Sequence, residues 1–364
     1  MTLLKVLIEI LGFFKFLWTV FTVDSPKPIR LVNLHFSTKP FRLLHLPLLA
    51  HDVIFSQMEI VDIYHLSKCS RRSRYAVKMF TCRQKYYFEI TASESYCSLN
   101  VSSRLGRETF YHELRQMDIR KPLGGAWLAT YSEDFWAATK EEIAYYLDVF
   151  TKKVNWLNFY DITNVTNMTE FLKEKTVLPV DWVLYAVREI DDEMYKYVLR
   201  EFKNVKKLDI RASPSADFQF DDMEPFTGEY ISIQDADWLT VDHLVRCFLN
   251  VEDIRMWTYS KRHLNVLVFN QFLNAWRNGL RVGKLNLVCY WTTNFDLPSI
   301  FKNVPTTEVK RVEVGDRKRF FDDGECFLIR QEESGLEAVV YFNIKFPIRS
   351  ICFTTNFRLL RDNE

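Results

Sequence analysis

The sequence has little glycine and almost no excess charge of either sign. Only ten glycines occur in 364 residues, well below the usual share of about 7%, which leaves little material for glycine-rich phosphate loops or collagen-like repeats. The formal net charge is +1, whereas a protein whose main role is to bind nucleic acid usually carries a strong basic surplus. We therefore expect no nucleic-acid partner.

Cysteine pairs and catalytic motifs are also missing. The seven cysteines stand singly, with no C-x-x-C pair, at Cys69, Cys82, Cys97, Cys247, Cys289, Cys326 and Cys352. This pattern argues against a disulfide framework or a zinc site and predicts buried thiols in a reducing compartment. The sequence contains no H-E-x-x-H, G-x-S-x-G, P-loop or G-x-G-x-x-G motif. We therefore predict a non-catalytic protein without cofactor or metal.

What the chain has is ordinary globular material with many aromatic residues. Hydrophobic residues make up 48% and charged residues 26%, which excludes a disordered chain. The length predicts about two domains. Thirty Phe, seventeen Tyr and nine Trp predict a well-filled core and a surface suited to contacts with other proteins.

Residues 1–23 are apolar but are interrupted by charge. Glu9 and Lys15 lie in the middle, and the longest uncharged run is the eight residues 16–23, too short for a membrane span of about 20 residues. Polar residues recur at helical spacing at Lys5, Glu9, Gly12, Lys15, Thr19 and Thr22. We predict an amphipathic helix, which either docks on its own protein, associates with a membrane surface or is dispensable.

Residues 24–39 read as a linker, and a helical module follows between Phe41 and Phe80. Leu46-Pro47 opens a helix, because proline is favoured in the first turn. About 40 residues with this many apolar positions cannot bury them alone. Either the rest of the chain or a partner must cover them.

The ordered string from Leu46-Pro47 to the run Leu66–Arg74 resembles an F-box. This resemblance implies a helical motif at residues 40–82 that docks on the Skp adaptor of a cullin-based ubiquitin ligase. It further implies docking residues at Leu46, Pro47, Leu49, Val53, Ile54, Met58, Ile63 and Leu66.

Short apolar strand-like segments recur after residue 154. In each segment, the first side chain expected to point into the core is that of residue 157, 183, 208, 231, 254 or 285. Amphipathic helical segments are expected between most of them, at 168–175, 192–202, 240–249 and 265–276. A strand and a helix every 23 to 26 residues are typical of a leucine-rich-repeat-like solenoid. The usual Asn/Cys ladder is absent, so we predict an irregular version. A compact doubly wound α/β domain is the alternative.

The same region carries a second resemblance. Lys206–Ile210, Tyr230–Ile233, Phe272-Leu273-Asn274-Ala275-Trp276 before Gly279, and Lys284–Leu287 follow in order. Residues 205–290 are thereby similar to the type 2 F-box-associated domain of the large nematode F-box family. The resemblance implies that residues 83–364 form a substrate-binding domain.

The sequence pattern of the C-terminal region predicts β-structure. Cys326–Arg330 and Leu336–Phe342 flank a loop with Gly335, which reads as a hairpin, and Ser350–Phe353 reads as a further strand. Earlier in the chain, segments 86–91 and 96–101 read as strands, and 140–150 as a helix. The predicted fold class is mixed α/β, with a small helical F-box, a strand and helix domain and a C-terminal β-hairpin.

In each predicted solenoid strand, the residue between the two apolar ones faces the opposite side of the sheet. These residues form a column, Asn158, Leu184, Asp209, Ser232, Arg255 and Asn286, flanked by Arg211, Gln234 and Trp257. A mixed polar and aromatic patch with Arg and Trp is what interface hot spots favour. We predict that this column binds the target protein.

Two functional hypotheses result. The first is the substrate-recognition adaptor of an SCF-type (Skp–cullin–F-box) ubiquitin ligase, cytoplasmic or nuclear, with the Skp adaptor, a cullin and an unknown protein target as partners. The second is a membrane-associated interaction scaffold that uses residues 1–23 and recruits no ligase.

Overall fold

The computed structural model describes residues 47–360, apart from residues 104–108, 117–126, 176–179, 258–263, 281–285, 292–296, 316, 323 and 344–348. The predicted amphipathic helix at 1–23, the linker at 24–39 and Leu46 lie outside the described residues.

The helices are α2 (Leu48–Phe55), α3 (Ile60–Cys69), α4 (Arg71–Thr81), α5 (Phe135–Val149), α6 (Thr166–Glu174), α7 (Asp192–Glu201), α8 (Leu264–Arg277) and α9 (Leu297–Ile300). The strands are β1 (Tyr86–Ala92), β2 (Tyr96–Ser103), β3 (Thr109–Arg115), β4 (Trp127–Tyr131), β5 (Trp156–Tyr160), β6 (Trp182–Glu189), β7 (Lys207–Ser213), β8 (Tyr230–Ile233), β9 (Asp253–Trp257), β10 (Asn286–Trp291), β11 (Thr307–Glu308), β12 (Arg311–Val314), β13 (Arg317–Phe320), β14 (Cys326–Arg330), β15 (Glu337–Asn343), β16 (Arg349–Thr354) and β17 (Phe357–Leu359).

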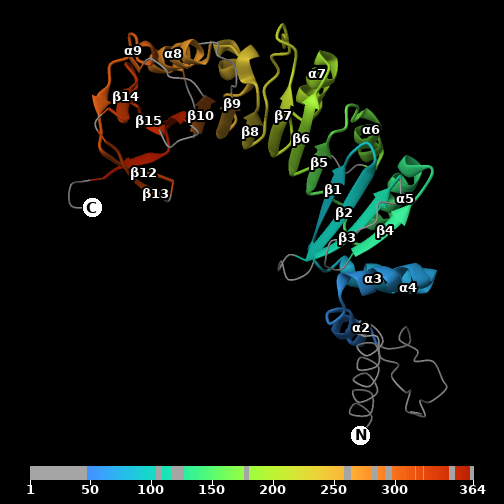
Figure 1. Cartoon of the computed structure of the whole chain (residues 1–364). Coiled ribbons are helices and arrows are strands. Elements are labelled where there is room, and N and C mark those ends of the chain that lie inside the picture. The colour runs from blue at the N-terminus through green and yellow to red at the C-terminus, as the bar shows by residue number, and fades with distance from the viewer. Residues whose placement is uncertain are drawn as a thin grey trace, which may run out of the picture. The chain divides into compact units, whose positions relative to one another are not determined.

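Within the described residues, fourteen strands form one mixed sheet, in the order β11-β14-β15-β16-β10-β9-β8-β7-β6-β5-β1-β2-β3-β4. Strands β5 to β10 are parallel neighbours in chain order, and β1 joins them in parallel beside β5. The antiparallel strands β14, β15 and β16 continue the sheet beyond β10, as Figure 1 shows. The mixed α/β prediction and the C-terminal hairpin are confirmed.

The predicted inward residues lie side by side across five strands. Backbone pairing aligns Leu157, Val183, Leu208, Ile231 and Ile254, and all five side chains are buried. The row continues in β10 with Leu287, not with the predicted Leu285. Because apolar residues at one register position stack across parallel strands, this row forms the spine of the core.

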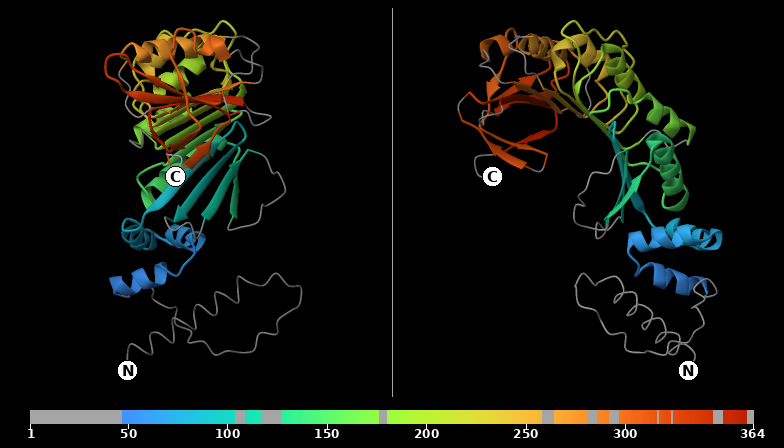
Figure 2. Two further views of the ribbon diagram at one scale, coloured as in Figure 1. Left: turned by 90° about the vertical axis from the view of Figure 1, so that its left-hand side faces the viewer. Right: turned by 45° about the vertical axis from the view of Figure 1, so that its right-hand side comes forward.

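Helices α5, α6, α7 and α8 lie along one face of the sheet in every view (Figures 1 and 2). A doubly wound domain carries helices on both faces, so that alternative is wrong. The predicted helix at 240–249 is a single π-helical turn, His243–Cys247. We call the opposite side of the sheet, which these helices leave uncovered, the open face.

A second, three-stranded sheet in the order β13-β12-β17 was not expected from the sequence. It packs on the open face near the C-terminus, where Val312 of β12 shares a buried cluster with Val288, Val339, Tyr341 and Cys352 of β10, β15 and β16. The open face is therefore apolar and covered there.

The six cysteines whose side chains the structure describes are free thiols. Cys97, Cys247, Cys326 and Cys352 are buried as predicted, but Cys69 and Cys82 are exposed. Both exposed thiols donate to the carbonyl one turn earlier, of His65 and Met79 respectively. The prediction of buried thiols is wrong for these two, because α3 and α4 each leave one side in solvent.

The Phe-Leu-x-x-Trp motif of α8 is part of the core. Phe272, Leu273 and Trp276 are buried, and the ring centroids of Phe272 and Trp276 lie 5.1 and 5.4 Å from that of Phe353 on β16. Gly279 has a φ of +101° and ends the helix, since this backbone conformation favours glycine. The motif thus joins α8 to the sheet.

We expect Trp276→Ala to lower the free energy of unfolding by about 3–5 kcal/mol, because it leaves a large cavity beside Phe353. Urea unfolding followed by circular dichroism measures the change. The matched control is Leu267→Ala on the same helix, where the side chain is 57% exposed and the expected change is within about 0.5 kcal/mol. Equal losses in both variants would contradict this assignment of the core.

Candidate functional site

Helix α2 divides its apolar residues between two sides. Pro47 is its N-cap, and Ile54 and Phe55 point into the module, where the Phe55 ring lies 5.4 Å from that of Phe80 on α4. Leu49 and Val53, one turn apart, are 79% and 65% exposed. Two large apolar side chains this exposed on one helix stripe indicate a surface that a partner covers.

Helix α4 presents a second such stripe. Ser70 and Ser73 form a capping box that begins the helix, and Val77 and Phe80 are buried. Tyr75 and Met79, one turn apart, are 66% and 37% exposed. Tyr75 and Met79 are not among the predicted docking residues, although their spacing of four on an otherwise basic helix is visible in the sequence.

The structure divides the predicted Skp-docking residues into three groups. Pro47, Leu49 and Val53 are exposed, and Met58 and Leu66 are half-buried. Ile54 and Ile63 are 7% and 2% exposed and lie in the core. Their side chains pack within the module itself. Leu46 lies outside the described residues.

Helix α3 fixes this module on the large sheet through aromatic residues. The Tyr64 ring stacks on that of Tyr146 of α5 at 5.4 Å and lies 5.4 Å from that of Phe110 on β3. The Tyr64 hydroxyl donates to Glu142 (3.2 Å), and Ser67 shares a 2.6 Å hydrogen bond with Tyr145. Lys68 pairs with Glu142 at 2.8 Å. Stacked rings and charge-assisted bonds together hold α3 against α5 and β3.

His112 lies at the centre of the junction. Its Nδ1 is 3.1 Å from the Tyr146 hydroxyl and its Nε2 is 2.9 Å from the Thr130 hydroxyl. Burial, together with the positive charges of Lys68 and His65, lowers the pKa of His112 to about 4. Burial and the nearby Glu142 raise the pKa of Tyr64 above its usual range. Both groups are therefore neutral near pH 7.

The strand register defines the rows of the open face. Asn158, Leu184, Asp209, Ser232 and Arg255 lie side by side, as the predicted column requires. The next residue in this row is Val288, whereas Asn286 pairs with Asp253. The predicted place of Asn286 is wrong, because β10 enters the sheet two residues later than the sequence pattern indicated.

The column is less exposed than predicted. Asp209 and Ser232 are each only 5% exposed, and Arg255, Trp257 and Gln234 are half-buried. Arg211, which is exposed, donates to Asp209 at 2.8 and 3.0 Å, and Arg255 donates to Asp253 at 3.1 Å. These two arginines thus carry partly neutralised charge.

Aromatic residues in the rows beside the column were missed. Trp156 is 46% exposed, and its ring lies 5.6 Å from that of Trp182. The Arg255 guanidinium stacks 5.1 Å from the ring centroid of Tyr230. The signal was present, because Trp156, Trp182 and Tyr230 each stand two residues before a predicted column position. Together with the column, they give the open face a polar and aromatic surface.

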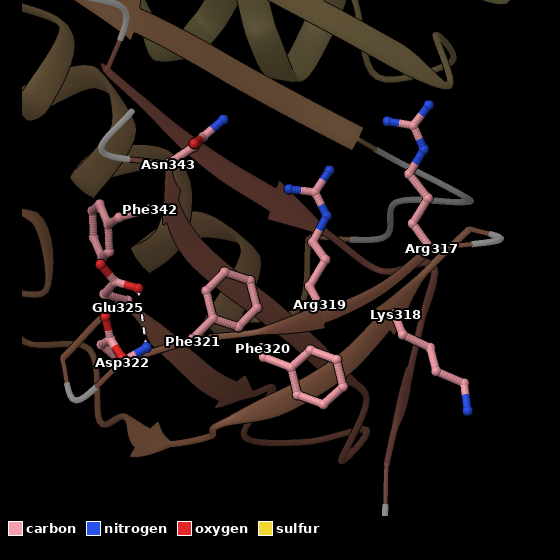
Figure 3. Close-up of a pocket in the computed structure, with 9 residues that line it drawn as sticks. All are labelled: Arg317, Lys318, Arg319, Phe320, Phe321, Asp322, Glu325, Phe342 and Asn343. Carbon is pink, nitrogen blue, oxygen red and sulfur yellow. Dashed lines mark hydrogen bonds between the residues drawn. The ribbon is translucent and has the colours of Figure 1, made fainter. Parts of the chain in front are cut away.

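Two hollows adjoin the open face. One of about 270 Å³ lies at the carboxyl ends of β5 to β8, and Tyr160, Arg188, Arg211 and Gln234 contribute to its lining. The other, of about 680 Å³, lies beside β13 and contains Arg317, Arg319 and Phe320 in its lining (Figure 3). The described side chains include no group of three or more His, Cys, Asp or Glu that could hold a metal ion.

Comparison with known proteins identifies one part of the chain. Residues 43–85 match the F-box domain, close to the range of 40–82 expected from the sequence. No curated protein and no solved structure matches the chain. The match ends at the start of the sheet, so the resemblance of residues 205–290 to a type 2 F-box-associated domain stays a prediction.

An F-box implies binding of a Skp adaptor and, with it, a role as non-catalytic substrate adaptor of an SCF ligase. Helices α2, α3 and α4 lie within the matched residues. None of the described helices is long and apolar enough to cross a membrane.

The lowered pKa of His112 predicts that the free energy of unfolding depends on pH. In the unfolded chain the imidazole binds a proton below a pKa of about 6.5, whereas in the folded chain it does so only below about 4. Folding stability should therefore fall as the pH drops from 6.5 to 4. We expect wild type to lose about 2–3 kcal/mol more than His112→Gln over this range, measured by urea unfolding at each pH. Equal losses of stability in wild type and His112→Gln would contradict the lowered pKa of His112.

Proposed function

We propose that the chain is the substrate-recognition adaptor of an SCF-type ubiquitin ligase, in which the F-box binds the Skp adaptor and the open face binds the target protein. The observation that carries the proposal is the exposed pair Leu49 and Val53 within the matched F-box. Leucine and valine at this exposure bury apolar area only when a partner covers them.

The mechanism is proximity. An adaptor that holds a target near the ubiquitin-charged enzyme turns a bimolecular encounter into an effectively intramolecular one. The size of this gain depends on the length and stiffness of the connection between the two binding surfaces. The bonds from Tyr64, Ser67 and Lys68 to helix α5 supply such a connection.

Residues 83–364 form the target-binding domain in this proposal, with the type 2 F-box-associated resemblance at 205–290 as its core. The leucine-rich-repeat-like interpretation is supported by the spacing of aligned inward residues, which is 26, 25, 23 and 23 from Leu157 to Ile254. It is also supported by the parallel order of successive strands. The membrane-scaffold alternative depends on residues 1–23, outside the described residues.

We expect Leu49→Asp with Val53→Asp to abolish binding of purified Skp adaptor, because two carboxylates replace the exposed apolar contact. A pull-down with full-length protein measures it. The matched control is Leu267→Asp with Leu336→Asp, which places the same change at residues 57% and 55% exposed outside the F-box. Binding retained by the first variant, or lost equally in both, would refute the proposed contact.

We expect Arg255→Ala with Trp257→Ala to release target proteins while Skp binding is unchanged, since the change lies on the open face, away from the F-box. Quantitative mass spectrometry of proteins bound under proteasome inhibition measures the loss. Lys196→Ala with Arg200→Ala on helix α7, on the helix-covered side, is the control. An unchanged set of bound proteins would show that Arg255 and Trp257 do not contribute to target binding.

A further inference from the structure

Strand β13 is an edge strand of the small sheet. It pairs only with β12, through Arg311↔Phe320 to Val314↔Arg317, and it is the outer strand of the small sheet among the described residues. Its other side therefore offers a row of backbone N–H and C=O groups. Such an edge is a template for a strand from another chain.

The side chains of β13 alternate between two directions. Arg317 and Arg319 point to the same side, and Lys318 and Phe320 point away from them (Figure 3), as the period of two in a strand requires. The Arg319 guanidinium lies 4.8 Å from the ring centroid of Tyr341, whose neighbours in the sheet pairing are Cys326 and Cys352. Arg319 is thereby held over the end of the open face.

These two arginines differ from the others at the open face. Arg211 and Arg255 are paired with Asp209 and Asp253. Arg317 and Arg319 form no ion pair with any residue in the described ranges. Among the described residues no carboxylate pairs with these two positive charges, and their spacing of two residues matches that of alternate side chains on an extended peptide.

The hollow beside β13 is polarised. Arg317 and Arg319 lie toward one end, and Asp322 and Glu325 lie at the other, with Phe321 between them (Figure 3). Glu325 accepts a 3.0 Å hydrogen bond from the backbone N–H of Asp322, so this carboxylate is occupied by its own loop. At the basic end, Arg319 contacts the Tyr341 ring, but neither arginine pairs with a carboxylate among the described residues.

We propose that β13 binds an extended acidic segment of the target protein, which adds as a strand to the β13 edge and places acidic side chains two residues apart on Arg317 and Arg319. Backbone hydrogen bonds would give affinity, and charge-assisted bonds to the two guanidinium groups would give specificity. Phe320, 66% exposed, adds an apolar contact on the other side. The inference rests on the proposed function, since it names the chemistry of the target.

The test is fluorescence anisotropy of the full-length chain with a fluorescein-labelled octapeptide of alternating valine and glutamate. We expect this probe to bind, a valine–lysine octapeptide not to bind, and binding to weaken with added salt. Arg317→Glu with Arg319→Glu should weaken binding by about tenfold or more, because both anion contacts become repulsive.

The matched control is Lys85→Glu with Lys152→Glu, which makes the same change in net charge at two exposed lysines outside β13. It should change affinity by less than about twofold, as expected for distant surface charges. Equal weakening in both variants, no binding of the valine–glutamate probe, or tighter binding of a single-stranded DNA octamer would overturn the proposal.

A Skp pull-down separates this proposal from the proposed function. The Arg317→Glu, Arg319→Glu variant should bind the Skp adaptor as wild type does. The Leu49→Asp, Val53→Asp variant should still bind the valine–glutamate octapeptide. Skp binding without peptide binding would overturn the β13 site alone. Peptide binding without Skp binding would overturn the ligase role and leave the β13 site intact.

Discussion

The in-register pairing of parallel strands β5 to β10 is the constraint on which the rest of the structure depends. Each strand contributes one inward apolar residue to the row from Leu157 to Leu287, and helices α6, α7 and α8 cover that row (Figure 1). Because side chains alternate along a strand, burial of this row also decides which residues face the other way. The open face is thus a consequence of how the core is packed.

The junction between the F-box and the sheet depends on a different kind of contact. Tyr64, Tyr146 and Phe110 stack around His112, whose pKa is lowered by burial and by nearby positive charge. Hydrogen bonds from Ser67 and Lys68 tie α3 to α5 at the same place. For an adaptor that acts by proximity, as proposed, such a junction would keep the F-box helices in a fixed orientation to the open face.

Charge is distributed along the open face in two ways. On β7 and β9, Arg211 and Arg255 are each neutralised by an aspartate two residues earlier, which suits a surface that contacts partners of mixed character. On β13, Arg317 and Arg319 pair with no carboxylate in the part of the chain that the structure describes. The small sheet closes the apolar end of the open face through Val312 and Val288 and at the same time provides the basic strand edge. If β13 binds as proposed, one element combines a structural and a recognition role.

The sequence alone determined the F-box, the strands β5 to β9 and the fold class, because these depend on local patterns: an ordered motif, and apolar residues at a fixed spacing. It misplaced Asn286, since the longer connection before β10 shifts the register by two residues, and register is set by pairing across the sheet. The F-box resemblance placed Ile54 and Ile63 among the docking residues, and their burial in the module could not be read from the motif, because burial depends on which helices pack beside them. Only the tertiary structure decided that Leu49 and Val53 face outward and that Arg317 and Arg319 meet no carboxylate among the described residues. Exposure and pairing depend on residues far apart in the chain, and these meet only in the folded protein.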